Sequence, residues 1–189
     1  MAIAAHSRKT DENLRWLALL GNLDFIVQPE LKNPFIKTIG PEIMELKGEY
    51  NIPAPREEVW AALNDPAVLE QCIPGCDEFE MVSPTEFNAR VTTKIGPVKA
   101  KFKGAVTLSN INPPKSYTIS GQGEGGVAGH AKGGADVTLA EADGGTLLSY
   151  KVNAQVGGKI AQIGSRLISS TAKKLAAKFF SAFSQKVGG

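Results

Sequence analysis

The strongest constraint on the fold of this chain is a series of seven segments in which apolar and polar residues alternate. The segment 45–52 places Leu46, Gly48, Tyr50 and Ile52 on one side, and this period of two is typical of a half-buried strand. Similar segments lie at 87–95, 98–108, 117–123, 127–139 and 148–156, and 77–82 is a weaker one. Strands with one apolar face predict an antiparallel sheet that needs a cover on that face.

The remaining periodic segments predict helices. Pro55 suits the first turn of a short helix that ends near Leu63, and a second short helix spans 67–72 before Pro74. Near the C-terminus, Ile160, Ile163, Leu167 and Thr171 share one side of a long amphipathic helix. Because it is the only helix long enough to cover the sheet, we predict an α+β fold. Its order is strand, two small helices, about six strands and a long C-terminal helix.

The first 43 residues differ from the rest of the chain. Pro29, Pro34 and Pro41 interrupt short apolar pieces there, whereas a regular strand follows Met44. We therefore expect an N-terminal extension at 1–43, either a docking segment or the product of a start codon set too early, and one domain at 44–189. No run approaches the ~18 apolar residues of a membrane span. No signal peptide is evident either, so we expect a cytoplasmic protein.

Charge is distributed unevenly along the chain. The segment from Gly144 to Gly189 holds seven of the 21 basic residues and none of the 19 acidic ones. A basic amphipathic helix can cover a core, hold an apolar ligand or lie on an anionic membrane. The candidate membrane or partner surface consists of Lys173, Lys174, Lys178 and Phe180 on the helix and Lys99, Lys101 and Lys103 on a hairpin; a solvated surface is the alternative. A net charge of +2 and few aromatic residues argue against nucleic acid.

The predicted inner face is unusually rich in small residues between Gly121 and Ala135, where a packed core would carry Val, Leu or Phe. This pattern predicts a cavity, although helix aromatics could also interlock with the small residues. An apolar lining favours a lipid-like or aromatic ligand. The residues that we expect to contact the ligand are Trp60, Phe102, Tyr117, Gly129, Ala131, Gly133, Tyr150, Ile163, Leu167 and Phe179.

Catalytic and metal-binding motifs are not evident. Cys72 and Cys76 lie four residues apart, but the only histidines are His6, in the extension, and His130, on the predicted outer face. A soft-ligand metal site needs more donors than this, so we expect no metal. No nucleophile can be paired with a base, and the Gly-rich stretch 121–134 lacks the ending of a phosphate-binding loop. We therefore expect no catalytic residues.

Three motifs resemble those of the family named for the G subunit of carbon monoxide dehydrogenase. They are CIPGC at 72–76, GEGGVAGHAKG at 123–133 and VGGKIAQIGSRLI at 156–168, the last followed by AAKFFSAF. The resemblance covers residues 44–189. It implies a START-like helix-grip fold of the SRPBCC superfamily, in which a curved sheet of about seven antiparallel strands surrounds a long C-terminal helix.

The resemblance also implies a function. Family members resemble carriers of apolar ligands that work with molybdenum hydroxylases in membrane recruitment or quinone exchange. We therefore expect a non-enzymatic binding protein for a quinone or lipid, with no cofactor other than such a ligand. Its expected partners are a carbon monoxide dehydrogenase-type enzyme and the anionic cytoplasmic face of the membrane. Two alternatives are a cyclase or hydrolase on the same superfold and an adaptor with a filled core.

Overall fold

The computed structural model describes residues 42–188, so nearly all of the predicted extension at 1–43 lies outside the described residues. Seven strands form one sheet in the order β1-β7-β6-β5-β4-β3-β2. All neighbouring strands are antiparallel. The strands are β1 (Glu42–Ile52), β2 (Cys76–Ser83), β3 (Glu86–Ile95), β4 (Val98–Asn112), β5 (Ser116–Glu124), β6 (His130–Ala142) and β7 (Gly145–Gly157). The predicted sheet is therefore confirmed, and β1 begins two residues before the predicted domain boundary.

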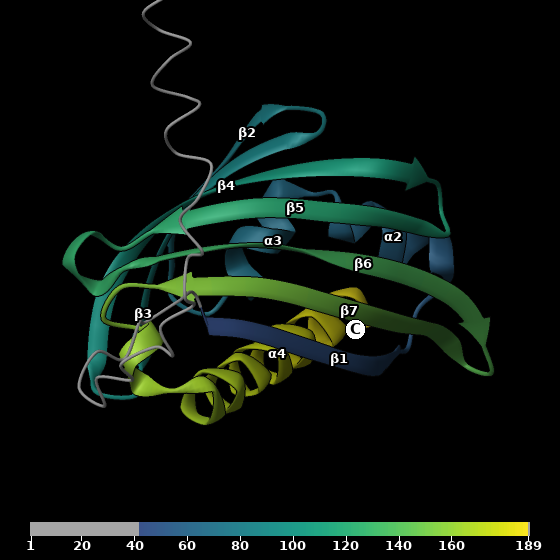
Figure 1. Ribbon diagram of the computed structural model, residues 1–189. Helices are drawn as coiled ribbons and strands as arrows, with labels where there is room; N and C mark the ends of the chain where they lie inside the picture. The colour runs from purple at the N-terminus through teal and green to yellow at the C-terminus, as the bar shows by residue number, and fades with distance from the viewer. Residues whose placement is uncertain (1–41, 189) are drawn as a thin grey trace, which may run out of the picture. The chain divides into compact units, whose positions relative to one another are not determined.

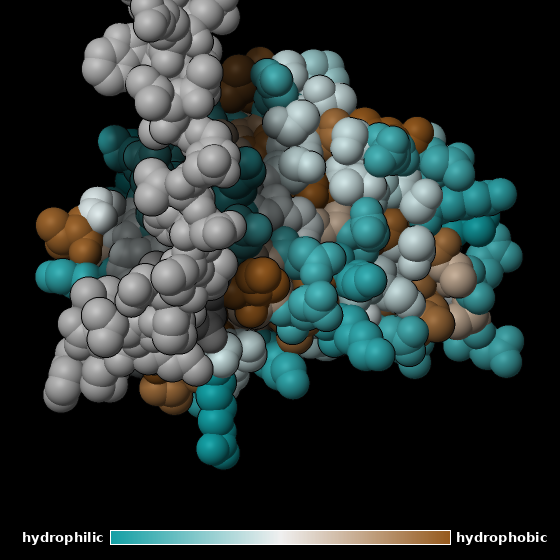
Figure 2. All heavy atoms as spheres, viewed as in Figure 1, coloured by the Kyte–Doolittle hydropathy of each residue, from teal (hydrophilic) through white to brown (hydrophobic). Residues whose placement is uncertain are grey.

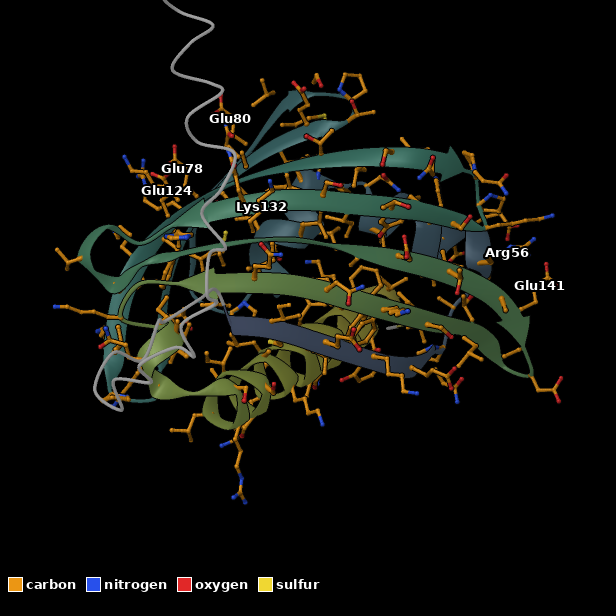
Figure 3. The ribbon with its side chains drawn as sticks, in the orientation of Figure 1. Arg56, Glu78, Glu80, Glu124, Lys132 and Glu141 are labelled. Carbon is orange, nitrogen blue, oxygen red and sulfur yellow. The ribbon has the colours of Figure 1, made fainter. Side chains whose placement is uncertain are left out.

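Three α-helices lie within the described residues. α2 (Arg56–Leu63) follows Pro55, and the side chain of Arg56 pairs with Glu141 at the end of β6, with Nη2 and Oε1 2.8 Å apart (Figure 3). α3 (Pro66–Cys72) begins where the Asp65 carboxylate accepts a hydrogen bond from the backbone N–H of Ala67 at 2.8 Å. The long C-terminal helix is α4 (Ser165–Val187).

The sheet curves around α4, and α2 and α3 lie on the same side of the sheet as α4 (Figure 1). Inward-facing residues alternate with exposed ones along β1, most of β4 and parts of β5–β7, as the period of two predicts, whereas β2 and β3 do not alternate regularly. A continuous antiparallel sheet with a single covered face needs one long element against it, and α4 is that element. The predicted helix-grip arrangement is confirmed.

The buried residues form two clusters rather than one continuous core. The first cluster joins β1, β5, β6 and β7 to α2, α3 and the C-terminal half of α4, and its members include Ile52, Val59, Tyr117, Leu148 and Phe183. The second consists of Ala128, Val156, Ile160 and Ile168. Phe183 has no exposed surface, and burying a side chain of this size stabilises the fold by about 1.5–3 kcal/mol. The two clusters hold the two ends of α4 against the sheet.

The predicted start of the C-terminal helix is wrong. Residues 161–163 form a separate 3-10 turn, η2 (Ala161–Ile163), and Gly164 with φ of 90° separates it from α4. Because this glycine changes the direction of the chain, Ile163 and Leu167 do not share a helix face. Ile163 packs against the second cluster, whereas Leu167 is 50% exposed.

The predicted start of the sixth strand is also wrong. A 3-10 turn, η1 (Gly126–Ala128), precedes β6, and both Gly126 and Gly129 have positive φ. A positive φ is readily adopted by glycine and interrupts the strand alternation. Val127 consequently points away from the sheet and is 85% exposed.

Candidate functional site

The middle of the sheet carries glycine and alanine at its inward-facing positions. Gly104 on β4 lies opposite Gly123 on β5, and Gly121 lies opposite Gly133 on β6. These four residues are half-buried, although they face the same side of the sheet as the buried residues at the strand ends. The middle of the inner face, between the two core clusters, is therefore less completely covered than either end.

The surroundings of these glycines indicate open space rather than close packing. A Cβ built at Gly104 would have one neighbour within 4 Å, the carbonyl oxygen of Gln122 at 3.5 Å. At Gly123 the one neighbour would be the carbonyl oxygen of Lys103 at 3.7 Å. Both neighbours belong to the adjacent strand, so no atom of α4 lies within 4 Å of a side chain added at either glycine.

At two other glycines, an aromatic ring of this chain occupies the place that a side chain would take. A Cβ at Gly48 on β1 would collide with the ring of Tyr150, whose nearest ring carbons are 2.8 and 2.9 Å away. At Gly125, next to η1, it would collide with the ring of Phe102. Some glycines therefore make room for aromatic rings of this chain, whereas a side chain added at Gly104 or Gly123 would meet only one backbone atom within 4 Å.

The inner face is chemically apolar. The inward-facing positions of β3, β4, β5 and β7 carry no charged side chain, and on β6 the exception is Glu141 near the strand end, which pairs with Arg56 of α2. The few hydroxyl groups there include those of Tyr117 and Tyr150, and burial raises the pKa of both phenols above its ordinary value. For Tyr150 the neighbouring Tyr50 adds to the increase. Neutral phenols beside small apolar residues can bind an apolar molecule but offer no general base at neutral pH.

The sequence model of one family, CoxG, the G subunit of carbon monoxide dehydrogenase, matches residues 48–188. The chain belongs to this family. No curated protein matches the sequence.

Solved structures agree with the CoxG assignment. A conserved protein from Geobacillus kaustophilus is 32% identical with a TM-score of 0.70, and the match covers 77% of this chain and 95% of that one. A protein from Chromobacterium violaceum is 14% identical with a TM-score of 0.58, covering 77% and 99%. A protein from Thermus thermophilus is 15% identical with a TM-score of 0.57, covering 76% and 96%. The last two show the shared START-like fold alone.

The structure brings most of the predicted ligand contacts of this CoxG chain to the two ends of the inner face. Tyr117 belongs to the first cluster, and Trp60, Tyr150 and Phe179 pack against it. The indole of Trp60 meets the ring of Tyr117 edge-on, with centroids 5.4 Å apart. Phe102, Ala131 and Ile163 pack against the second cluster. Gly133 lies between the two, close to the backbone of Asn153 and Ala154 on β7.

Two predicted ligand contacts are misplaced. Gly129 lies in the turn before β6, where an added Cβ would collide with the backbone of Gly157, so this residue closes a turn and does not line the inner face. Leu167 is half-exposed at the start of α4 because Gly164 reorients the helix. In contrast, Gly104 was absent from the predicted set; its place in the alternation of β4 was the signal that could have included it.

The predicted surface lysines are exposed, but part of the hairpin charge is paired. Lys99, Lys101 and Lys103 alternate along the outer side of β4, and Lys173, Lys174 and Lys178 line the exposed side of α4. Lys101 pairs with Asp77 at 3.1 Å. A hydrogen bond from Thr92, together with Lys101, lowers the pKa of the Asp77 carboxyl below its ordinary value. Carboxylates of β2 and β5, including Glu78 and Glu124, share this outer side (Figure 3).

Phe180 was predicted to belong to the candidate membrane or partner surface, but the structure packs its ring against the sheet. Its ring stacks on Tyr50 with centroids 4.1 Å apart and on Tyr150 with centroids 5.6 Å apart. The stripe of α4 rotates toward its C-terminus, so Phe179, Phe180 and Phe183 all contribute to packing. Tyr50 was also missed, although the alternation of β1 places it on the inner face.

The two cysteines are free thiols. Cys72 is buried and Cys76 is half-buried, and burial raises the pKa of both. Within residues 42–188, no group of three or more His, Cys, Asp or Glu side chains could hold a metal ion. Among the helices of this same range, none is long and apolar enough to cross a membrane.

Proposed function

We propose that this chain is a non-enzymatic carrier that holds an apolar molecule, a quinone or a lipid, between the sheet and α4. The observation that carries this proposal is the space in front of Gly104 and Gly123, where no side chain lies within 4 Å of an added Cβ. A molecule that fills this space would bury apolar surface worth about 25 cal/mol per Å². It would also join the two core clusters into one.

The family supports a role beside a redox enzyme, because it is named for the G subunit of carbon monoxide dehydrogenase. We therefore propose that the chain assists a carbon monoxide dehydrogenase-type molybdenum hydroxylase at the cytoplasmic face of the membrane. In this role it would deliver or receive the apolar molecule.

The membrane contact of this proposal lies at the end of the domain where the β5–β6 turn and the start of α4 meet. The N–H of Ile160 donates to the carbonyl of Ala128 at 3.0 Å, which joins η1 to the chain before α4. The turn after β3 reaches the same place, since a Cβ at Gly96 would contact Ile163 at 3.2 Å. Figure 1 shows these turns at the end of the sheet away from the C-terminus.

This end combines exposed apolar and basic side chains. Val127 is 85% exposed and Leu167 is 50% exposed. The segments 94–99, 125–132 and 157–167 contain no acidic residue, and their exposed basic residues include Lys94, Lys99, Lys159 and Arg166. Each basic residue held near an anionic leaflet contributes about 1 kcal/mol. By comparison, hydrophilic side chains cover much of the outer side of β5–β7 (Figure 2).

The carrier proposal is tested by filling the space. Leucine at both Gly104 and Gly123 should leave the fold intact, because an added Cβ meets its neighbour at an ordinary contact distance. We expect the double variant to lose at least tenfold in affinity for the neutral probe N-phenyl-1-naphthylamine, measured by fluorescence titration.

The matched control is Ala105→Leu, which adds bulk on the exposed outer side of β4 beside Gly104. It should leave probe affinity unchanged. Equal affinity in a folded Gly104→Leu/Gly123→Leu variant would argue for an adaptor with a filled core. Organic extraction of the natively purified protein, followed by mass spectrometry, would identify the bound molecule.

A further inference from the structure

The space in front of Gly104 and Gly123 adjoins the second cluster. Gly123 lies directly opposite Ala131 in the pairing of β5 with β6, and Phe102 lies two residues before Gly104 on the inner side of β4. Ala131 and Phe102 both pack against the second cluster. On β4 the first cluster is reached only at Leu108, four residues beyond Gly104. Along the strands, the end that the second cluster closes is therefore the nearer one.

A short segment between two glycines closes this end. Residues 158–163, the plug segment, join β7 to α4 and include η2. Gly158 has φ of 77° and Gly164 has φ of 90°, so the chain changes direction on both sides of η2. Ile160 is 2% exposed and belongs to the second cluster, and Ile163 packs against that cluster. The plug segment therefore directs two apolar side chains into the end of the domain next to the proposed ligand space.

Few polar interactions hold the plug segment. Within residues 42–188, its one backbone hydrogen bond to another segment runs from the N–H of Ile160 to the carbonyl of Ala128 at 3.0 Å. No side chain of the plug segment forms a hydrogen bond or ion pair in this range. The second cluster has four buried residues, whereas the first has ten. Regions with few buried apolar contacts open at a lower free energy than the core does, so this end should open more readily.

We propose that the plug segment is the gate of the carrier, and that the apolar molecule enters and leaves when Ile160 and Ile163 withdraw from the second cluster. This inference rests on the proposed carrier function and specifies the route to its binding space. Hinges of such gates are residues at the ends of elements that absorb changes in φ and ψ, and Gly158 and Gly164 occupy these positions. The gate lies at the end proposed to contact the membrane (Figure 1), so an opened gate would face a source of apolar molecules.

The experiment locks the gate with a disulfide in the variant Ala128→Cys/Ile160→Cys. The hydrogen bond between these two residues brings their Cα atoms near the spacing that a disulfide needs, roughly 4.4–6.8 Å, and both side chains belong to the second cluster. Peptide mapping confirms the bond. Cys72 and Cys76 are free thiols, so a reductant breaks the introduced bond alone. Stopped-flow fluorescence measures the rates at which N-phenyl-1-naphthylamine binds and is released into excess cyclodextrin.

We expect the cross-linked protein to bind and to release the probe about tenfold more slowly, or slower still, than the same protein after reduction. The equilibrium affinity should stay within about threefold, because a gate slows entry and exit alike. Unchanged rates in the cross-linked protein would overturn the inference. A change in the release rate alone would also overturn it, since the plug segment would then be a ligand contact and not a gate.

The matched control is Thr138→Cys/Ser149→Cys, a pair that lies directly opposite on the outer side of β6 and β7. Its oxidation adds a cross-link of the same kind away from the gate and should leave both rates unchanged. Equal slowing in this control would mean that any cross-link stiffens the domain, and the gate would be rejected.

If the cross-link does not form, Ile163→Ala tests the same gate by loosening it. This variant removes an apolar contact between the plug segment and the second cluster, so binding and release should both become about three- to tenfold faster. Leu139→Ala, in the first cluster, is its control: it should lower the melting temperature without accelerating exchange. Equal acceleration in the two variants would point to general loosening and overturn the gate.

Two outcomes separate the gate from the carrier proposal. Failure of the full chain to bind the probe would overturn both. Probe binding by the full chain, together with exchange rates that do not respond to the lock, would overturn the gate alone and place the route of entry elsewhere on the inner face.

Discussion

Two glycines of this chain, Gly129 and Gly104, differ in backbone conformation and in the space around them, so they tolerate different substitutions. Gly129 has φ of 120°, and an added Cβ would collide with the backbone of Gly157. Gly104 lies in a regular strand and has room for a side chain. Backbone geometry requires glycine at the first position, whereas the second position can accept a side chain without collision.

At Gly129 we predict that alanine destabilises the fold by about 1–3 kcal/mol, the usual cost of backbone strain at such a position. The measurement is the free energy of unfolding in urea. Gly126→Asn is the control: Gly126 also has a positive φ, 57°, but no atom lies within 4 Å of an added Cβ. Asparagine tolerates this conformation, so the control should lose less. Equal losses in the two variants would mean that the close approach to Gly157 is unimportant.

Residue-level features of the site were only partly predictable from the sequence. Alternation placed Phe102, Tyr117 and Tyr150 correctly on the inner face, because the period of two is a local property of a strand. The same rule failed at Gly129, since nothing in the alternation reveals that two glycines with positive φ interrupt it.

At the scale of elements, α4 is held by an aromatic stack at one end and by the second cluster at the other. Phe180 lies against Tyr50 and Tyr150, which come from two adjacent strands at the edge of the sheet. The stack therefore connects the C-terminal half of the helix to β1 and β7.

Phe180→Ala should destabilise the fold by about 2–4 kcal/mol, within or slightly below the usual range for a buried phenylalanine because the residue is only half-buried. Urea unfolding followed by circular dichroism measures this loss. Leu167→Ala removes a comparable apolar side chain from the exposed side of α4 and should cost less than about 1 kcal/mol. The ranking would be reversed if Leu167, and not Phe180, faced the sheet as the sequence pattern indicated.

Elements were predicted more reliably than their ends. Seven alternating segments and one amphipathic segment were sufficient to predict the order of elements along the chain and the helix that covers the sheet, but not the order of the strands within the sheet. The start of α4 was misjudged because Ile160, Ile163 and Leu167 have helical spacing. Gly164 and the hydrogen bond from Ile160 to Ala128 separate them physically, and this bond joins two segments about thirty residues apart.

On the scale of the described domain, the two core clusters leave the middle of the inner face less covered than its ends, and two of the exposed apolar residues, Val127 and Leu167, lie at one end. Charged side chains are also distributed differently along the sheet and at this end. Acidic residues pair with part of the hairpin charge along the sheet, as Asp77 does with Lys101 and Glu78 with Arg90. The segments at the end with Val127 contain basic residues without acidic ones, which supports the proposal that this end contacts an anionic leaflet.

This arrangement predicts that the full chain sediments with phosphatidylglycerol-containing vesicles at low salt and less as salt rises, because screening weakens the lysines. Reversing the charge of Lys159 and Arg166 should weaken binding about 10- to 30-fold, since each contributes about 1 kcal/mol near the leaflet. Val127→Ser should weaken binding at every salt concentration, because it removes an apolar contact without affecting the core. Lys173→Glu/Lys174→Glu is the matched control on the exposed side of α4 and should have a smaller effect. A larger effect of this control would place the membrane contact on α4, as the sequence pattern alone suggests, and a chain that never sediments would remove the membrane from the proposed function.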